Sequence, residues 1–268
     1  DRGGVFAWLK GTYDLVQSHL RPLIKGILIN KFRGDVSLLQ PGIEMFSEHV
    51  PVPVLGVIPW LQIELEDEDS QNLESKWVSD PKIRVAVVRL PYLSNFTDFD
   101  PLRQVEGLSL LFTSKPTEIE EADLVILPGS KNTLHDIQFL KESGIAETLH
   151  RLQGKTWIMG ICGGYQMMGE QIDDPHGMES GGSDQGLMMF PMITVLGGDK
   201  RLVRKDYTGM NWFEGLEFKA YEIHLGRSEF SGKPPEMLIG DEENLAVMDF
   251  NKRLFGTYLH GLLESPEI

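Results

Sequence analysis

The chain has 268 residues, a net charge of −15 and a single cysteine. This length allows one large domain or two modest ones, and 41% hydrophobic with 24% charged residues is typical of a protein that buries a core. A chain this acidic lacks the basic face that attracts nucleic acid or anionic lipid, and no run approaches the roughly 18 apolar residues of a membrane helix. We therefore expect no nucleic-acid partner and no membrane. One cysteine cannot form an internal disulfide, which favours a reducing, cytoplasmic location.

The N-terminal region predicts a small α/β unit. Residues 26–30 are typical of a buried strand, 41–50 suit a helix with Pro41 near its start, and 52–58 predict a second strand. Residues 64–80 hold seven acidic residues with little apolar periodicity, which favours a linker. We expect one unit over residues 1–63, this linker over 64–80, and a second domain over 81–268. Because the chain does not start with methionine, we also expect it to begin inside a longer protein.

Strands and helices alternate along the second domain. The predicted strands cover residues 84–89, 108–112, 122–127, 156–160, 192–196, 216–224, 245–249 and 254–258, and the predicted helices start near 100 and 162 and cover 133–140 and 145–152. This alternation predicts an α/β fold with a mostly parallel sheet covered by helices on both faces.

Cys162 lies in the run G-I-C-G-G-Y-Q, between a predicted buried strand and a predicted helix. A sharp strand-to-helix turn holds a nucleophile exposed, and small neighbours permit the strained backbone that the turn requires. The first N–H groups of the helix favour a thiolate and can stabilise an oxyanion. A buried structural cysteine in a glycine-rich turn is the alternative that the motif alone leaves open.

Two further motifs follow predicted strands. The run P-G-S-K-N-T at residues 128–133 brings Gly129, whose missing side chain lets its N–H approach a ligand closely. The run L-F-G-T-Y-L-H-G ends an apolar strand in His260. Ligands collect at the carboxyl ends of strands in a parallel sheet, so His260 and Cys162 are expected to share one crevice. Taken singly, each motif could equally be a turn or a surface residue.

Together these three motifs resemble the class I glutamine amidotransferases, in the branch that amidates cobyrinate. S-N-F-T-D-F-D-P-L at 94–102, Y-E-I-H-L-G at 221–226, and D-R-G-G-V-F-A with N-K-F-R-G-D near the start are similar to the cobyric acid synthase family. The resemblance implies a flavodoxin-like sheet, Cys162 as nucleophile, His260 as its base, and backbone oxyanion donors at Gly129 and Gly163. It also implies glutamine as substrate and a corrinoid as acceptor.

The resemblance further implies a front domain that resembles dethiobiotin synthetase and activates carboxylates with ATP and Mg²⁺. Its phosphate loop, G-x-x-x-x-G-K-[ST], does not occur in these 268 residues. Residues 1–63 are therefore expected to be the tail of that domain, with the missing N-terminal part of the parent chain as a partner. By resemblance, Asn30 at a strand end is expected to contact adenine.

The sequence departs from ordinary triad amidotransferases, which read His-x-Glu, because Leu262 occupies the Glu position. We therefore expect a Cys–His dyad, with His260 oriented by a backbone carbonyl, a water or Glu222. Glu222 and His224 share one face of a strand, as a surface pair, a metal pair or part of the site. No third ligand has metal-site spacing, so no metal site is expected.

Three more polar residues have expected roles. Gln166, together with Glu222 and His224, is a candidate for binding substrate. Asp98 and Asp100 are most simply helix caps in a loop that borders the crevice.

The function expected from the sequence is glutamine-dependent amidation of corrinoid side-chain carboxylates, with this chain supplying ammonia. Two alternatives stay open. One is a related amidotransferase acting on another acid, such as cobyrinic acid or a cell-wall lipid. The other is a binding module that keeps the fold without turnover.

Overall fold

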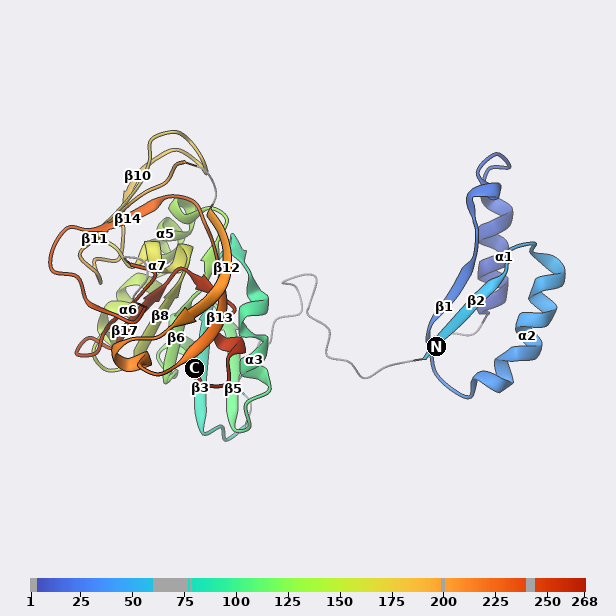
Figure 1. Cartoon of the computed structure of the whole chain (residues 1–268), viewed down its shortest axis with the longest axis horizontal. Helices are drawn as coiled ribbons and strands as arrows, with labels where there is room; N and C mark the ends of the chain where they lie inside the picture. Colours follow the sequence, from blue (N-terminus) through green and yellow to red (C-terminus); the bar gives the residue numbers. More distant parts are fainter. Residues whose placement is uncertain (1–3, 60–76, 78, 199–200, 240–243) are drawn as a thin grey trace. The chain divides into compact units, whose positions relative to one another are not determined.

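The computed structural model describes residues 4–59, 77, 79–198, 201–239 and 244–268. The chain forms two compact units, Asp1–Leu65 and Glu66–Ile268 (Figure 1). Most of the predicted linker, residues 64–80, lies outside the described residues. Among the helices of the described ranges, none is long and apolar enough to cross a membrane.

The smaller unit is a single β-α-β crossover preceded by a helix. Strands β1 (Ile27–Phe32) and β2 (Val54–Pro59) pair in parallel, and helix α2 (Val36–His49) connects them. Helix α2 begins five residues earlier than predicted, because Asp35 Oδ1 accepts a hydrogen bond from the Ser37 N–H at 2.8 Å and caps it there. The prediction that Pro41 starts this helix is therefore wrong. Helix α1 (Val5–Leu15) and the 3-10 turn η1 (Arg21–Leu23) precede the crossover.

The larger unit is built on a seven-stranded sheet, ordered β15-β16-β17-β8-β6-β3-β5. Five neighbouring strands, β17 to β5, are parallel, and β15 and β16 extend the sheet antiparallel. The mostly parallel α/β sheet that the sequence predicts is thereby confirmed. The strand bounds are β3 Ile83–Val88, β5 Leu108–Thr113, β6 Leu124–Leu127, β8 Trp157–Ile161, β15 Glu236–Met237, β16 Ala246–Asp249 and β17 Leu254–Thr257.

Helices cover both faces of this sheet because the chain crosses it in two directions. The connection from β3 to β5 runs toward one edge, whereas those from β5 to β6 and from β6 to β8 run the other way. Right-handed crossovers place oppositely directed connections on opposite faces. Helix α3 (Asp100–Arg103) thus lies on one face, and α4 (Pro116–Ile119), α5 (Thr133–Glu142) and α6 (Ile145–Leu152) lie on the other.

Three smaller sheets complete the described part of the larger unit. A four-stranded sheet contains β9 (Gln171–Asp174), β10 (Gly182–Gln185), β11 (Met192–Val195) and β14 (Arg227–Phe230). A three-stranded sheet joins β12 (Arg201–Thr208), β13 (Glu217–His224) and β18 (Leu259–His260), and β4 (Leu93–Ser94) pairs with β7 (Gly129–Ser130). The remaining helical turns are η3 (Phe96–Phe99), α7 (Gly163–Met167), η4 (Asn211–Phe213) and η5 (Leu262–Glu264).

Candidate active site

Cys162 occupies a strained turn between β8 and α7. Its φ of 52° and ψ of −111° are disfavoured for a residue with a side chain, and such strain concentrates at functional sites. The turn is possible because Gly164 follows, where a Cβ atom would stand 1.9 Å from the Leu127 carbonyl oxygen. The Cys162 amide donates to the Thr257 carbonyl at 2.8 Å, which ties the turn to the end of β17.

His260 reaches the same place from the neighbouring strand. Strands β17 and β8 pair in parallel from Leu254↔Ile158 to Thr257↔Ile161, so their carboxyl ends lie side by side. The chain continues from β17 into β18, which carries His260, fully buried at 1% exposure. Cys162 and His260 thus lie at neighbouring strand ends, where the sequence predicts a shared site.

The orientation of the His260 ring is set by Asp98. The Nδ1 atom lies 2.6 Å from Asp98 Oδ2, and the other carboxylate oxygen accepts from the Gly261 N–H at 3.1 Å. Asn95 Nδ2 also lies 3.2 Å from Nδ1. The shorter contact to a carboxylate assigns the Nδ1 proton, so the ring donates to Asp98. The Tyr221 ring stacks on a face of the His260 ring, with 5.3 Å between the ring centroids and 20° between the ring planes.

These contacts leave Nε2 of His260 for the cysteine. Within the described part of the chain, Nε2 has no hydrogen-bond partner of ordinary length. Burial lowers the pKa of His260, but hydrogen bonding to Asp98 and interaction with Cys162 outweigh it and raise the pKa to about 10. The imidazolium form of His260 is therefore favoured, with the Asp98 carboxylate on Nδ1 and the Cys162 side chain facing Nε2. In its thiol form, Cys162 has the Ile223 carbonyl as acceptor at 3.4 Å.

Two expectations about this site are wrong. Asp98 and Asp100 do not cap helices, because neither η3 nor α3 has a side-chain cap hydrogen bond and Asp98 faces His260 instead. Glu222 does not orient His260, because its Oε1 atom is held by His224 Nε2 at 2.6 Å and by Arg201 at 2.8 Å. Leu262 is buried in the core, consistent with its being no substitute for a carboxylate.

The loop after β6 lies beside the cysteine turn. Because the Lys131 N–H donates to the Tyr92 carbonyl, the alternation of antiparallel pairing turns the Gly129 amide toward β4 and the Ser130 amide away from it. The Ser130 nitrogen lies 2.9 Å from where a Cβ atom on Gly163 would stand. Gly129 itself lies beside the His260 ring, because a Cβ atom there would be 3.6 Å from His260 Cε1.

Asp136 holds this loop by two hydrogen bonds. Its carboxylate accepts from the Ser130 hydroxyl at 2.6 Å and from the Tyr92 N–H at 3.2 Å. The side chain is completely buried, and this burial raises the pKa of Asp136.

Glu222 and His224 share a face of β13, as predicted, and border a cavity of about 970 Å³. Arg201, Ser228, Asn244 and Tyr258 also line it. Tyr258 lies between His224 and Gln166, since its ring stacks on His224 at 4.0 Å between ring centroids and its hydroxyl interacts with Gln166 and Ser228. Gln166 is buried and donates to the Leu225 carbonyl at 3.0 Å, so it holds the turn between β13 and β14.

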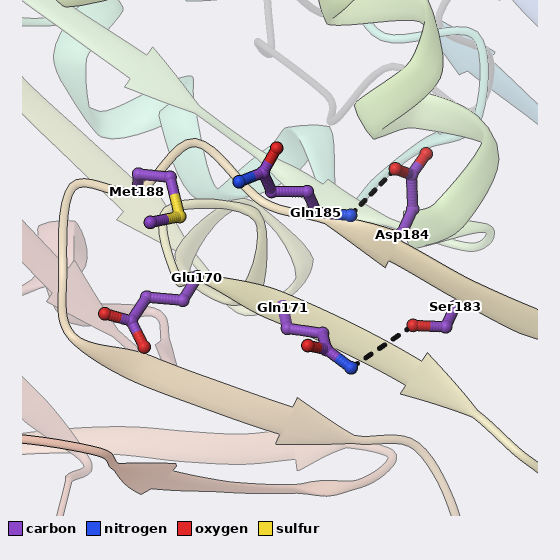
Figure 2. Close-up of a pocket in the computed structure, with 6 residues that line it drawn as sticks. All are labelled: Glu170, Gln171, Ser183, Asp184, Gln185 and Met188. Carbon is purple, nitrogen blue, oxygen red and sulfur yellow. Dashed lines mark hydrogen bonds between the residues drawn. The ribbon is translucent and has the colours of Figure 1, made fainter.

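A second, separate pocket of about 530 Å³ lies on β9 and β10 (Figure 2). Its polar side chains are engaged by hydrogen bonds, as between Gln171 Nε2 and Ser183 Oγ at 3.3 Å and between Lys141 Nζ and Asp184 Oδ1 at 2.8 Å. Among the described residues, no three His, Cys, Asp or Glu side chains are grouped to hold a metal ion. Asn30 lies within β1 and not at its end, and its Oδ1 atom accepts from the following N–H.

Residues 84–268 match the family model of the CobB/CobQ-like glutamine amidotransferase domain. The chain belongs to this family. A solved glutamine amidotransferase structure shares the fold with a TM-score of 0.52 and 18% identity, over 68% of this chain and 93% of that one. The Cys162 turn described above thus lies in a glutamine amidotransferase domain.

Full-length relatives confirm the resemblance to cobyric acid synthases. The chain is 41% identical over 293 residues to the cobyric acid synthase of Lachnoclostridium phytofermentans and 42% identical over 276 residues to that of Parabacteroides distasonis. Both alignments cover 100% of this chain but only 57% and 55% of the relatives. The chain therefore spans little more than half the length of these relatives.

Asp98 contacts His260 in this site, although its sequence context predicts a helix cap. A signal was available, because Asp98 lies in the 94–102 segment that resembles the family and follows a strand of the parallel sheet. Its partner is 162 residues away, beyond the reach of any local pattern.

Proposed function

We propose that this chain hydrolyses glutamine and supplies the ammonia for amidation of corrinoid side-chain carboxylates. In the parent protein, this amidation converts adenosylcobyrinic acid a,c-diamide to cobyric acid in cobalamin biosynthesis. The observation that carries the glutaminase half is the meeting of Cys162 and His260 at the ends of adjacent parallel strands. The corrinoid acceptor is supported by the relatives, which are cobyric acid synthases.

In the first step, the Cys162 thiolate attacks the side-chain amide carbon of glutamine, and the C–N bond then breaks. The departing nitrogen takes the Nε2 proton of His260, since the raised pKa of His260 keeps that proton in place at neutral pH. The product is a thioester of glutamate on Cys162 together with free ammonia.

In the second step, water attacks the thioester and gives one proton to Nε2 of His260. Glutamate leaves, and the thiolate–imidazolium pair is restored. Both steps pass through an oxyanion, for which the N–H of Gly163 is one donor. The geometry of β7 favours the Ser130 N–H over that of Gly129 as the second donor.

Activation of the acceptor carboxylate by ATP and Mg²⁺ is assigned to the part of the relatives that this chain does not span. The residues present here do not fit a nucleotide–metal site, because the 268 residues contain no phosphate loop and the described ones contain no acidic metal cluster. Residues 1–63 are then the tail of that ATP-binding domain, with Asn30 near the adenine. Glu222, His224 and Gln166 stay as candidates for holding the substrate.

A glutamine analogue carrying an electrophile tests the proposal directly. Because Cys162 is the only cysteine, mass spectrometry should find one adduct per chain, on the peptide that contains it. Excess glutamine should protect Cys162, and alanine at the same concentration should not. Labelling that glutamine does not slow would contradict a glutamine site at Cys162.

A further inference from the structure

We propose that Asp98 is the positioning carboxylate of this site, supplied from a loop before the nucleophile in place of the Glu that Leu262 replaces. This inference deepens the proposed function and rests on it. The site is then a triad of Cys162, His260 and Asp98, with its third member 64 positions before the nucleophile instead of two after the base.

The first support is the geometry of the carboxylate. One oxygen lies 2.6 Å from His260 Nδ1 and the other accepts the Gly261 N–H, so Asp98 holds both the ring and the backbone beside it. These two contacts fix the tautomer and the rotation of the imidazole, and they orient Nε2 toward the sulfur of Cys162. Leu262, two residues after His260, has no atom that could do this.

The second support is the way Asp98 is itself held. The next residue, Phe99, is fully buried and packs edge-on against Phe112, which fixes η3 against β5. Before it, Asn95 adopts a left-handed conformation with φ of 53°, which turns the chain into η3. Asp98 is 5% exposed, so little water competes for its carboxylate.

The third support is that the other groups around His260 cannot replace Asp98. Tyr221 stacks on the ring face and Cys162 faces the opposite nitrogen, while Glu222 is engaged by His224 and Arg201. Asn95 reaches the same nitrogen at 3.2 Å but carries no charge. Asp98 is thus the carboxylate that stabilises the imidazolium formed during the reaction.

Asp98→Asn is the sharpest test, because the amide keeps the shape and one acceptor oxygen. We expect kcat for glutamine hydrolysis to fall about 10- to 100-fold, as for other orienting groups, with KM changed less than about threefold. Asp98→Glu should recover part of kcat. Asp100→Asn, the same substitution in the same loop, should stay within about twofold of wild type.

A pH profile separates positioning from mere folding. The alkaline limb of kcat/KM in the wild type should lie near the raised pKa of His260, about 10, and should move toward its ordinary value of 6.5 in Asp98→Asn but not in Asp100→Asn. A purely structural role would lower activity without moving this limb. A limb that does not move in Asp98→Asn would overturn the proposal, whether or not kcat falls.

Titration of His260 by NMR gives a result that does not depend on turnover. If the wild type fails to hydrolyse glutamine, the proposed function fails, yet the role of Asp98 is still decided by this titration. A fall of the His260 pKa by about one unit or more in Asp98→Asn supports the positioning role, and a smaller change overturns it.

Discussion

At the scale of single residues, the site depends on the contacts among Asp98, His260 and Cys162 more than on any one of them. The Asp98 carboxylate contacts Nδ1 of His260, and the Cys162 side chain faces the opposite nitrogen, Nε2. Burial alone would lower the pKa of His260 and favour neutral groups. The carboxylate of Asp98 opposes that effect and favours the protonated imidazole, the form that can give a proton to the leaving nitrogen.

This arrangement links folding stability to pH. The pKa of His260 is raised from 6.5 to about 10 in the folded protein, so its contribution is fully present below pH 6.5 and is lost as the pH rises through about 10. The difference in unfolding free energy between wild type and Asp98→Asn should therefore be largest near pH 6 and shrink toward about pH 10. Urea unfolding at several pH values measures it, and a difference that does not vary with pH would contradict this linkage.

At the scale of elements, the two-residue strand β7 positions the Ser130 N–H, the second oxyanion donor in our proposal. Its contact with β4 is short, so the buried carboxylate of Asp136 supplies much of what holds it. Asp136→Ala should lower kcat roughly 10- to 100-fold, because a misplaced donor stabilises the oxyanion poorly. The cost should fall on kcat more than on KM.

Two control variants show whether the loss in Asp136→Ala comes from the position of β7. Asp136→Asn keeps an acceptor for the Tyr92 N–H and should retain more activity than Asp136→Ala. Asp184→Ala removes a carboxylate on β10 that pairs with Lys141 near the end of α5, and should leave kcat unchanged. Equal losses in Asp136→Ala and Asp184→Ala, with folding intact by circular dichroism, would show that β7 has no special role.

The elements that the sequence predicts well are those with a continuous apolar run. Strands β3, β6, β8 and β17 are buried on both faces, and α6 has the predicted bounds because its apolar face repeats at helical spacing. Strands β10 and β12 were not predicted, since their residues are mostly polar and exposed, nor was β9, which has a single apolar residue. Their pairing depends on partners that are distant in sequence.

Some residues of the candidate site can likewise be predicted from local sequence, and Asp98 cannot. Cys162, Gly163 and His260 follow from local motifs, because a strained turn needs glycine and a strand end presents its last polar residue. Asp98 does not follow from any local motif, since its role appears only when the β3–α3 loop meets β18 across 162 positions. Helix-capping statistics point to the wrong role for the same residue.

At the scale of the whole molecule, the chain spans about half of its cobyric acid synthase relatives. It should hydrolyse glutamine but should not amidate a corrinoid alone, even with ATP, Mg²⁺ and ammonia, because the phosphate-binding loop is absent from its sequence. Isothermal titration with ATP and Mg²⁺ should show affinity no tighter than about millimolar. Micromolar binding would place the nucleotide site within this chain.

The central claim is that Cys162 is the nucleophile of a glutaminase, and glutamate release by Cys162→Ser tests it most directly. The hydroxyl has nearly the same shape as the thiol, so the fold should persist, but it ionises far less readily and should not be activated by His260. We expect glutamate release to fall by at least about a thousandfold relative to the wild type. Activity within about tenfold of the wild type would contradict the account.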